Sequence, residues 1–199
     1  MNSSKIFTGV VMGAILLFTG LMMPITAEAH CDRVNGPVAT DARQALETGD
    51  VTKALIWVGE EQEAALKSAF KQSRTVYKKG EASRELAERY FMSTVVRLHR
   101  QAEGKPFTGL KPAQPAAADI QTAEEALETG NIKPVMNMLT RAIETETSKL
   151  LQEAIQAKKQ RNASVRAGRE WSDAYVKYII YVHNLYRTIQ AGPAHGVGE

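Results

Sequence analysis

The sequence has little cysteine, few aromatic residues and almost no strand-like pattern. Its one cysteine among 199 residues, Cys31, has no partner within the chain, so an internal disulfide is excluded. Aromatic residues make up 7% of the chain, and apolar and polar residues rarely alternate, which favours an all-α fold. The sequence has no glycine-rich phosphate loop, nucleophile elbow or His-Glu-x-x-His zinc motif. The net charge is only +3, with basic residues scattered among acids, so we expect no nucleic-acid partner.

The first 29 residues have the three parts of a secretory signal. Lys5 provides the positive start, residues 6–23 form an apolar run that ends at Pro24, and Ala27-Glu28-Ala29 is a small-x-small cleavage site. We therefore predict that 1–29 is a cleaved signal peptide and that the mature chain starts at His30. The protein is expected to be exported, periplasmic or secreted, without stable membrane insertion after cleavage. A retained membrane anchor is the alternative.

The mature chain contains an internal duplication. The segment Ala45 to Val51 recurs 81 residues later as Ala126 to Ile132, and the segment Phe91 to His99 aligns with Tyr175 to His183 at an offset of 84. Two separated blocks with nearly the same offset indicate two equivalent units. The predicted organisation is an N-terminal segment 30–36, repeat 37–103, a Pro/Ala/Gly-rich linker 104–118, repeat 119–191 and a flexible tail 192–199.

Each repeat has the periodicity and end signals of helices. Gly49 is a typical helix stop, and acids open and lysines close the segment Glu60 to Lys79, as the helix dipole favours. The predicted helices are Thr40–Thr48, Val51–Val58, Glu60–Lys79, Ser83–Glu103, Ala116–Thr129, Ile132–Leu139, Ala142–Arg161 and Arg166–Ala191. We predict an all-α helical bundle built from two pseudo-equivalent helical-hairpin repeats packed face to face.

One histidine per repeat falls in an apolar helical arc. His99 lies in the arc of 83–103 with Glu103 beside it, whereas Arg100 falls on the opposite, polar side. His183 lies at the equivalent place in the last helix, with Arg187 where Glu103 stands in the first repeat. Both histidines are thus candidate metal ligands, and Glu103 and Arg187 a candidate ion pair across the repeats. Equally, each histidine could be a core residue hydrogen-bonded to a tyrosine or a backbone carbonyl.

Cleavage after Ala29 would create a set of metal ligands at the new N-terminus. His30 would offer an α-amine and an imidazole, and Cys31 a thiolate and an ionisable amide. Such nitrogen and sulfur donors suit nickel or copper in square-planar geometry. We predict His30 and Cys31 as primary metal ligands, with Asp32 in support. The alternative is that these residues are a simple tail.

The mature start, His30 to Pro37, resembles the metal-binding hook of nickel superoxide dismutase, a family of helical bundles. The resemblance implies that His30 binds nickel through its amine and imidazole and that Cys31 binds it through its amide and thiolate. Asp32 and Gly36 match framework positions of that hook. Asn35 stands where that family has a second cysteine ligand, so the resemblance implies altered ligation here.

The body of the chain is similar to an uncharacterised family of exported bacterial helical proteins whose mature chains open with His-Cys-Asp. The similarity lies in the segments 90–100 and 108–112. It brings no known activity. The function we expect is an exported protein that binds nickel or copper. A non-metal helical interaction or ligand-binding module, whose protein partner would be unknown, is the alternative, and a superoxide dismutase-like enzyme with altered ligation is a weaker one.

Overall fold

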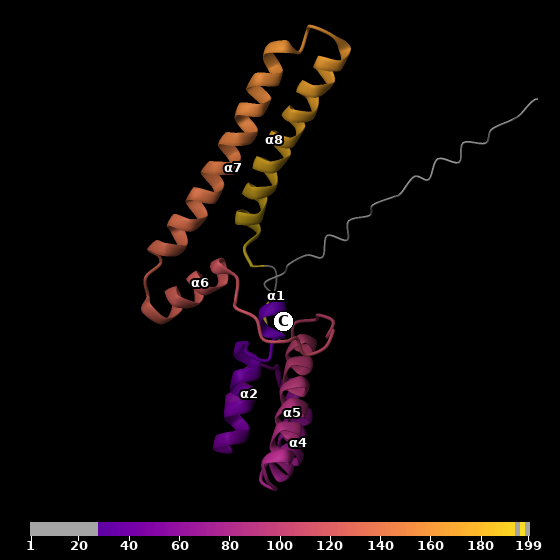
Figure 1. Cartoon of the computed structure of the whole chain (residues 1–199), viewed down its shortest axis with the longest axis vertical. Coiled ribbons are helices and arrows are strands. Elements are labelled where there is room, and N and C mark those ends of the chain that lie inside the picture. The colour runs from indigo at the N-terminus through magenta and orange to yellow at the C-terminus, as the bar shows by residue number, and fades with distance from the viewer. Residues whose placement is uncertain (1–27, 194–195, 198–199) are drawn as a thin grey trace, which may run out of the picture.

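The computed structural model describes residues 28–193 and 196–197, so most of the predicted signal peptide lies outside the described residues. Helices are its main elements, and the described part contains one isolated β-bridge, between Arg33 and Lys111. The helices are α1 (Glu28–Cys31), α2 (Pro37–Thr48), α3 (Thr52–Leu55), α4 (Glu60–Tyr77), α5 (Glu81–Ala102), α6 (Ala118–Thr129), α7 (Lys133–Gln160) and α8 (Val165–Ala191) (Figure 1). The predicted all-α class is confirmed.

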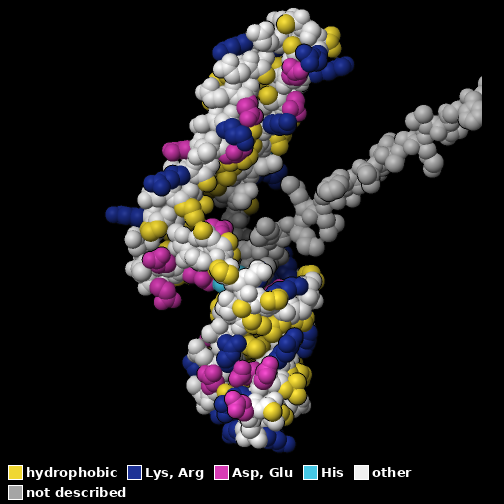
Figure 2. All heavy atoms as spheres, viewed as in Figure 1, with side chains coloured by type: hydrophobic (Ala, Val, Ile, Leu, Met, Phe, Trp, Pro, Cys, Tyr) yellow, Lys and Arg dark blue, Asp and Glu magenta, His cyan; other side chains and the backbone are white. Residues whose placement is uncertain are grey.

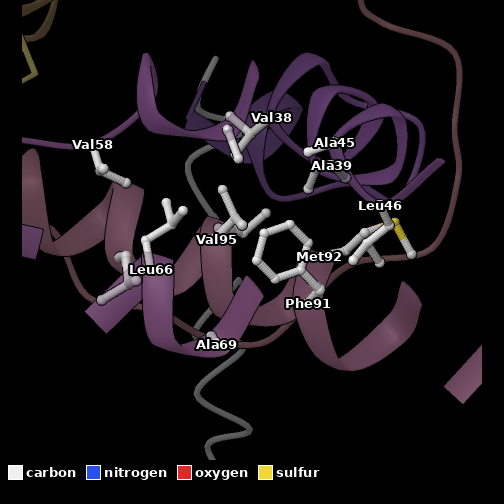
Figure 3. Packing of buried hydrophobic residues seen from close by; sticks show 14 of the residues in the cluster. Val38, Ala39, Ala45, Leu46, Val58, Leu66, Ala69, Phe91, Met92 and Val95 are labelled. Atoms are coloured by element: carbon white, nitrogen blue, oxygen red, sulfur yellow. The ribbon is translucent and has the colours of Figure 1, made fainter. Parts of the chain in front are cut away.

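The buried core lies in the first half of the chain, where α2 and α4 pack on α5. Val38 and Ala39 of α2 face Val95 and Phe91 of α5, and the Phe91 ring lies 5.6 Å from that of Phe70 on α4 (Figure 3). Phe91 and Val95 are fully enclosed, as the apolar arc of 83–103 predicts. The N-terminal segment packs on this three-helix core, through Asp32 and Arg100.

The duplicated sequence produces the same helix stop and turn in both halves. Gly49 ends α2 and Gly130 ends α6, both with positive φ, and their N–H groups donate to Ala45 and Ala126 at 2.8 and 2.9 Å. Only glycine adopts this left-handed conformation without a steric penalty. The next residue then accepts a hydrogen bond from the amide two positions on, Asp50 in the first half and Asn131 in the second. This local structure is therefore set by the local sequence.

The second half differs from the prediction in its longest element. Two helices, Ile132–Leu139 and Ala142–Arg161, were expected, but α7 is continuous from Lys133 to Gln160. In the first half, Gly59 separates α3 from α4 in an extended conformation. At the 81-residue offset its counterpart is Thr140, which continues the helix because it imposes no break.

The two halves also do not pack face to face. Helices α7 and α8 form an antiparallel hairpin that packs on itself and extends away from α2, α4 and α5 (Figure 1). Ala154 is the one buried apolar residue of this hairpin. None of the helices described in the structure has the length and apolar character needed to span a bilayer.

Candidate functional site

The segment from His30 to Gly36 lies across the C-terminal end of α5 and is held by the linker. Lys111 N–H donates to the Asp32 carbonyl at 2.7 Å, and Val34 N–H donates to the Lys111 carbonyl at 3.0 Å. The Asn35 amide group donates to the Gln114 carbonyl and accepts from the Gln114 N–H, at 3.0 and 3.2 Å. Asn35, which stands in place of the second hook cysteine, therefore serves to join this segment to the linker.

Gly36 allows the segment to fold back closely on itself. A Cβ atom at this position would lie 2.2 Å from the carbonyl oxygen of His30, far inside van der Waals contact. Its N–H donates to the Arg33 carbonyl at 2.9 Å, and its own carbonyl accepts from Thr40 in the first turn of α2. The position of His30 and Cys31 thus depends on the absence of a side chain at Gly36.

A buried ion network lies directly beneath the segment. The Arg100 guanidinium donates to the Asp32 carboxylate at 2.6 Å and to the Glu103 carboxylate at 2.8 Å. Burial opposes the charge of Arg100, but the hydrogen bond and the charges of these two carboxylates raise its pKa. The expectation that Arg100 lies on the polar side of its helix is wrong, because the N-terminal segment covers the last turn of α5 and leaves this side chain 2% exposed.

The thiol of Cys31 is partly buried among charged side chains, one arginine and three carboxylates. Burial raises its pKa, the Arg100 charge opposes that shift, and the carboxylates of Glu103, Asp32 and Glu124 raise the pKa further. The protonated thiol is thus favoured when no cation is near. A cation that replaces the thiol proton would be attracted by the three carboxylates and repelled by Arg100.

His30 has one ring nitrogen engaged and the other free of hydrogen bonds. Nε2 lies 2.9 Å from the Glu124 carboxylate on α6, and Nδ1 is buried without a hydrogen-bond partner. Since an ionised carboxylate only accepts, this contact assigns a hydrogen to Nε2, and in the neutral tautomer the lone pair is then on Nδ1. A shallow hollow of about 320 Å³ adjoins the ring, lined by His30, Asn35, Pro37, Thr40, Asp41 and Glu124.

His99 is a buried core histidine close to this network. Its Nδ1 lies 2.8 Å from the backbone carbonyl of Trp57, and its ring meets the Trp57 ring edge-on at 5.9 Å. Its Nε2 is 3.4 Å from the Glu103 carboxylate. His99 thus makes the contact expected of a core histidine, between Nδ1 and a backbone carbonyl. The role of His99 as a metal ligand stays a prediction.

His183 and Arg187 lie apart from this cluster. Both are exposed on α8, so the inward orientation expected for His183 is wrong. The apolar arc that contains His183 exists, but its residues are exposed, and no other helix within residues 28–193 covers it. In place of the predicted pair with Arg187, Glu103 bonds Arg100 and lies near His99 within its own helix.

The structure brings together five of the residues that the sequence singled out. Asp32 and Glu103 share Arg100, and both act on the pKa of Cys31, which follows His30. His99 lies beside Glu103. The described residues contain no cluster of three or more histidine, cysteine, aspartate or glutamate side chains with metal-binding geometry. The remaining hook donors, the His30 amine and the Cys31 amide, belong to the main chain. Sequence reasoning missed Arg100, Trp57 and Glu124, because each reaches the site through contacts between distant segments.

Comparison with known proteins gives a family but no activity. No curated protein and no solved structure matches the chain. A protein-family match spans residues 35–181, which covers the first repeat and most of the second and begins after His30, Cys31 and Asp32. The chain therefore belongs to the family described as "Family of unknown function (DUF6448)".

Proposed function

We propose that the mature protein is exported and binds one transition-metal ion, nickel or copper, through His30 and Cys31. The observation that carries this proposal is the orientation of the His30 ring: Glu124 engages Nε2, and Nδ1 is buried without a hydrogen-bond partner. Metal-binding histidines are commonly oriented in this way, by a carboxylate on the nitrogen that does not bind the metal. Nδ1 is also the ring nitrogen nearer the main chain, so it can share an ion with the α-amine of the same residue.

The surroundings of Cys31 support a cationic ligand as well. The carboxylates of Asp32, Glu103 and Glu124 all act on the thiol and would attract a bound cation, against the opposing charge of Arg100. The Cys31 thiolate and amide would complete a nitrogen and sulfur donor set suited to nickel or copper. Asn35 supplies no thiolate and is bonded to Gln114, so the proposal is metal binding rather than dismutation.

The test uses protein purified from the compartment to which it is exported, with mass spectrometry to establish its first residue. We expect a start at His30 and about one equivalent of nickel or copper by titration calorimetry and elemental analysis. Cys31→Ser and a form with one added alanine before His30 should both lose this binding, because the first lacks the thiolate and the second displaces the amine. Equal affinity in the extended form would contradict the proposal.

A matched pair of glutamates on α6 tests the role of Glu124. Glu124→Gln should weaken metal binding by about 10- to 100-fold, because the amide no longer fixes the His30 ring as a carboxylate does. Glu125→Gln changes the neighbouring exposed side chain and should leave the affinity unchanged. Equal effects of the two substitutions would show that Glu124 does not orient the ligand.

One observation favours the second candidate function, a helical interaction module. Helix α8 leaves a row of apolar side chains exposed to solvent. None of these residues belongs to the proposed metal site.

A further inference from the structure

Helix α8 carries two parallel rows of apolar residues, and only one of them is packed. The less exposed row turns toward α7 and consists of Trp171, Ala174, Tyr178, Tyr181 and Leu185. The second row, the α8 stripe, consists of Tyr175, Ile179, Val182, Tyr186 and Ile189, with exposed fractions of 47, 42, 38, 62 and 61%. Its alternating spacing of four and three residues is that of a coiled-coil seam. Hydrophobic side chains are visible along the hairpin in Figure 2.

The first half of the chain shows what an equivalent row does when it is covered. At the offset of 84 residues, the first four positions of the α8 stripe correspond to Phe91, Val95, Leu98 and Ala102 of α5. These side chains are only 0, 0, 3 and 7% exposed, in a core formed with α2 and α4. The α8 stripe therefore has the apolar pattern of a row that faces a core, but its side chains are exposed.

The chain does not cover the stripe with its own equivalent of α2. That equivalent is α6, which packs against α7, and its Glu124 is bonded to His30 in the first half. Leu127 of α6 is 85% exposed, whereas the corresponding Leu46 of α2 is fully buried against α5. None of the helices that the structure describes therefore removes the stripe from water, which leaves it open to a partner.

The stripe is apolar along its length, as the centre of an interface between two subunits is. Its five side chains expose about 500 Å² of largely apolar surface, which is at the upper end of patches on monomers. Exposed Met136 and Leu139 of α7 extend the surface at the end near Ile189. Lys177 and Arg187, the charged residues between Tyr175 and Ile189, both fall outside the stripe.

We propose that a second copy of this chain covers the stripe, with the two α8 helices antiparallel about a twofold axis at Val182. In this register Val182 meets its own counterpart, Tyr175 lies opposite Ile189 of the second copy, and Ile179 opposite Tyr186. Each large aromatic ring is then paired with a smaller branched side chain. The stripe is thus complementary to itself, as a twofold interface requires, and the two hairpins form a four-helix bundle.

The first test is the mass of the mature protein in solution. Sedimentation equilibrium at micromolar concentrations should give twice the mass of one chain for the unmodified protein. Val182→Glu should give the mass of one chain, because it places two carboxylates together on the axis. Asn184→Glu, on the opposite side of α8, is the matched control and should remain dimeric. A monomeric unmodified protein, or equal effects of the two substitutions, would overturn the proposal.

The second test locates the axis by cross-linking. In a Cys31→Ser background, Val182→Cys should form a disulfide between two chains on mild oxidation, whereas Asn184→Cys should not. A fully reduced Val182→Cys dimer would place the axis elsewhere and contradict the register. Because this background lacks the proposed metal ligand, dimer formation is tested independently of metal binding.

Discussion

At the scale of single residues, Arg100 is the most consequential side chain near the candidate site. It is the largest fully buried side chain in the described residues, and it joins Asp32 of the N-terminal segment to Glu103 of α5. Buried charges are tolerated when each is paired and hydrogen-bonded. Arg100 thus fixes the residue next to Cys31 on the rigid core, which helps to preorganise the proposed metal ligands.

Replacing Arg100 by methionine should destabilise the protein by about 3–5 kcal/mol, because two buried carboxylates would lose their shared cation. Arg97→Met, on the exposed face of the same helix, should change the free energy of unfolding by about 0.5 kcal/mol or less. Urea denaturation monitored by circular dichroism measures both. Adding Asp32→Asn and Glu103→Gln to Arg100→Met should recover part of the loss. A similar small effect for both arginines would mean that the buried network contributes little.

At the scale of helices, α2 and α6 have related sequences but different surroundings. Both end in Ala-Leu-Glu-Thr followed by a left-handed glycine. Helix α2 buries one face against α5, whereas α6 has no buried residue. Local sequence therefore determines that each helix forms and where it stops, but not how much apolar surface it buries.

This difference predicts unequal effects of the same substitution at equivalent positions. Leu46→Ala should destabilise the protein by about 2–5 kcal/mol, because it leaves a cavity in the core. Leu127→Ala should change stability by about 0.5 kcal/mol or less, because its side chain is already in water. Chemical denaturation of the two variants gives the comparison. A large loss for Leu127→Ala would show that α6 is covered in solution.

At the scale of the whole molecule, the core is distributed unevenly. The buried cluster belongs to the first half, whereas the α7–α8 hairpin is supported by the contact between its own two helices and by α6. A two-helix hairpin encloses little apolar surface, so its stability should be lower than that of the three-helix core. Association through the α8 stripe would supply the missing burial.

Hydrogen exchange should report this difference directly. In the monomeric Val182→Glu variant, amides of α8 should exchange at least about tenfold faster than core amides of α5. In the unmodified protein, α8 protection should increase with protein concentration, whereas α5 protection should not. Equal protection of α5 and α8 in the variant, at all concentrations, would contradict the uneven stability inferred here.

Much of the fold could be predicted because its determinants are local. The ends of α4 and α8 lie within a few residues of their predicted positions, and Gly49 and Gly130 stop their helices as expected. Helical hydrogen bonds and glycine caps join residues a few positions apart, so the sequence contains the whole interaction. The continuity of α7 was missed because the break at Gly59 was expected to recur in the second half. That half has no glycine at the equivalent position, so the helix continues.

The candidate site was predicted only in part, because its contacts join distant segments. The sequence singled out His30, Cys31 and Asp32, but Arg100 lies 68 residues from Asp32 and Glu124 lies 94 residues from His30. The helical period relates residues three or four positions apart, so it does not predict such distant pairs.

The sequence alone determined the helical class and the helix stops at Gly49 and Gly130. Tertiary structure decided that Arg100 and His99 are enclosed while His183 lies exposed on α8. The physical reason is that periodicity shows which face of a helix is apolar, whereas burial depends on whether another element covers that face.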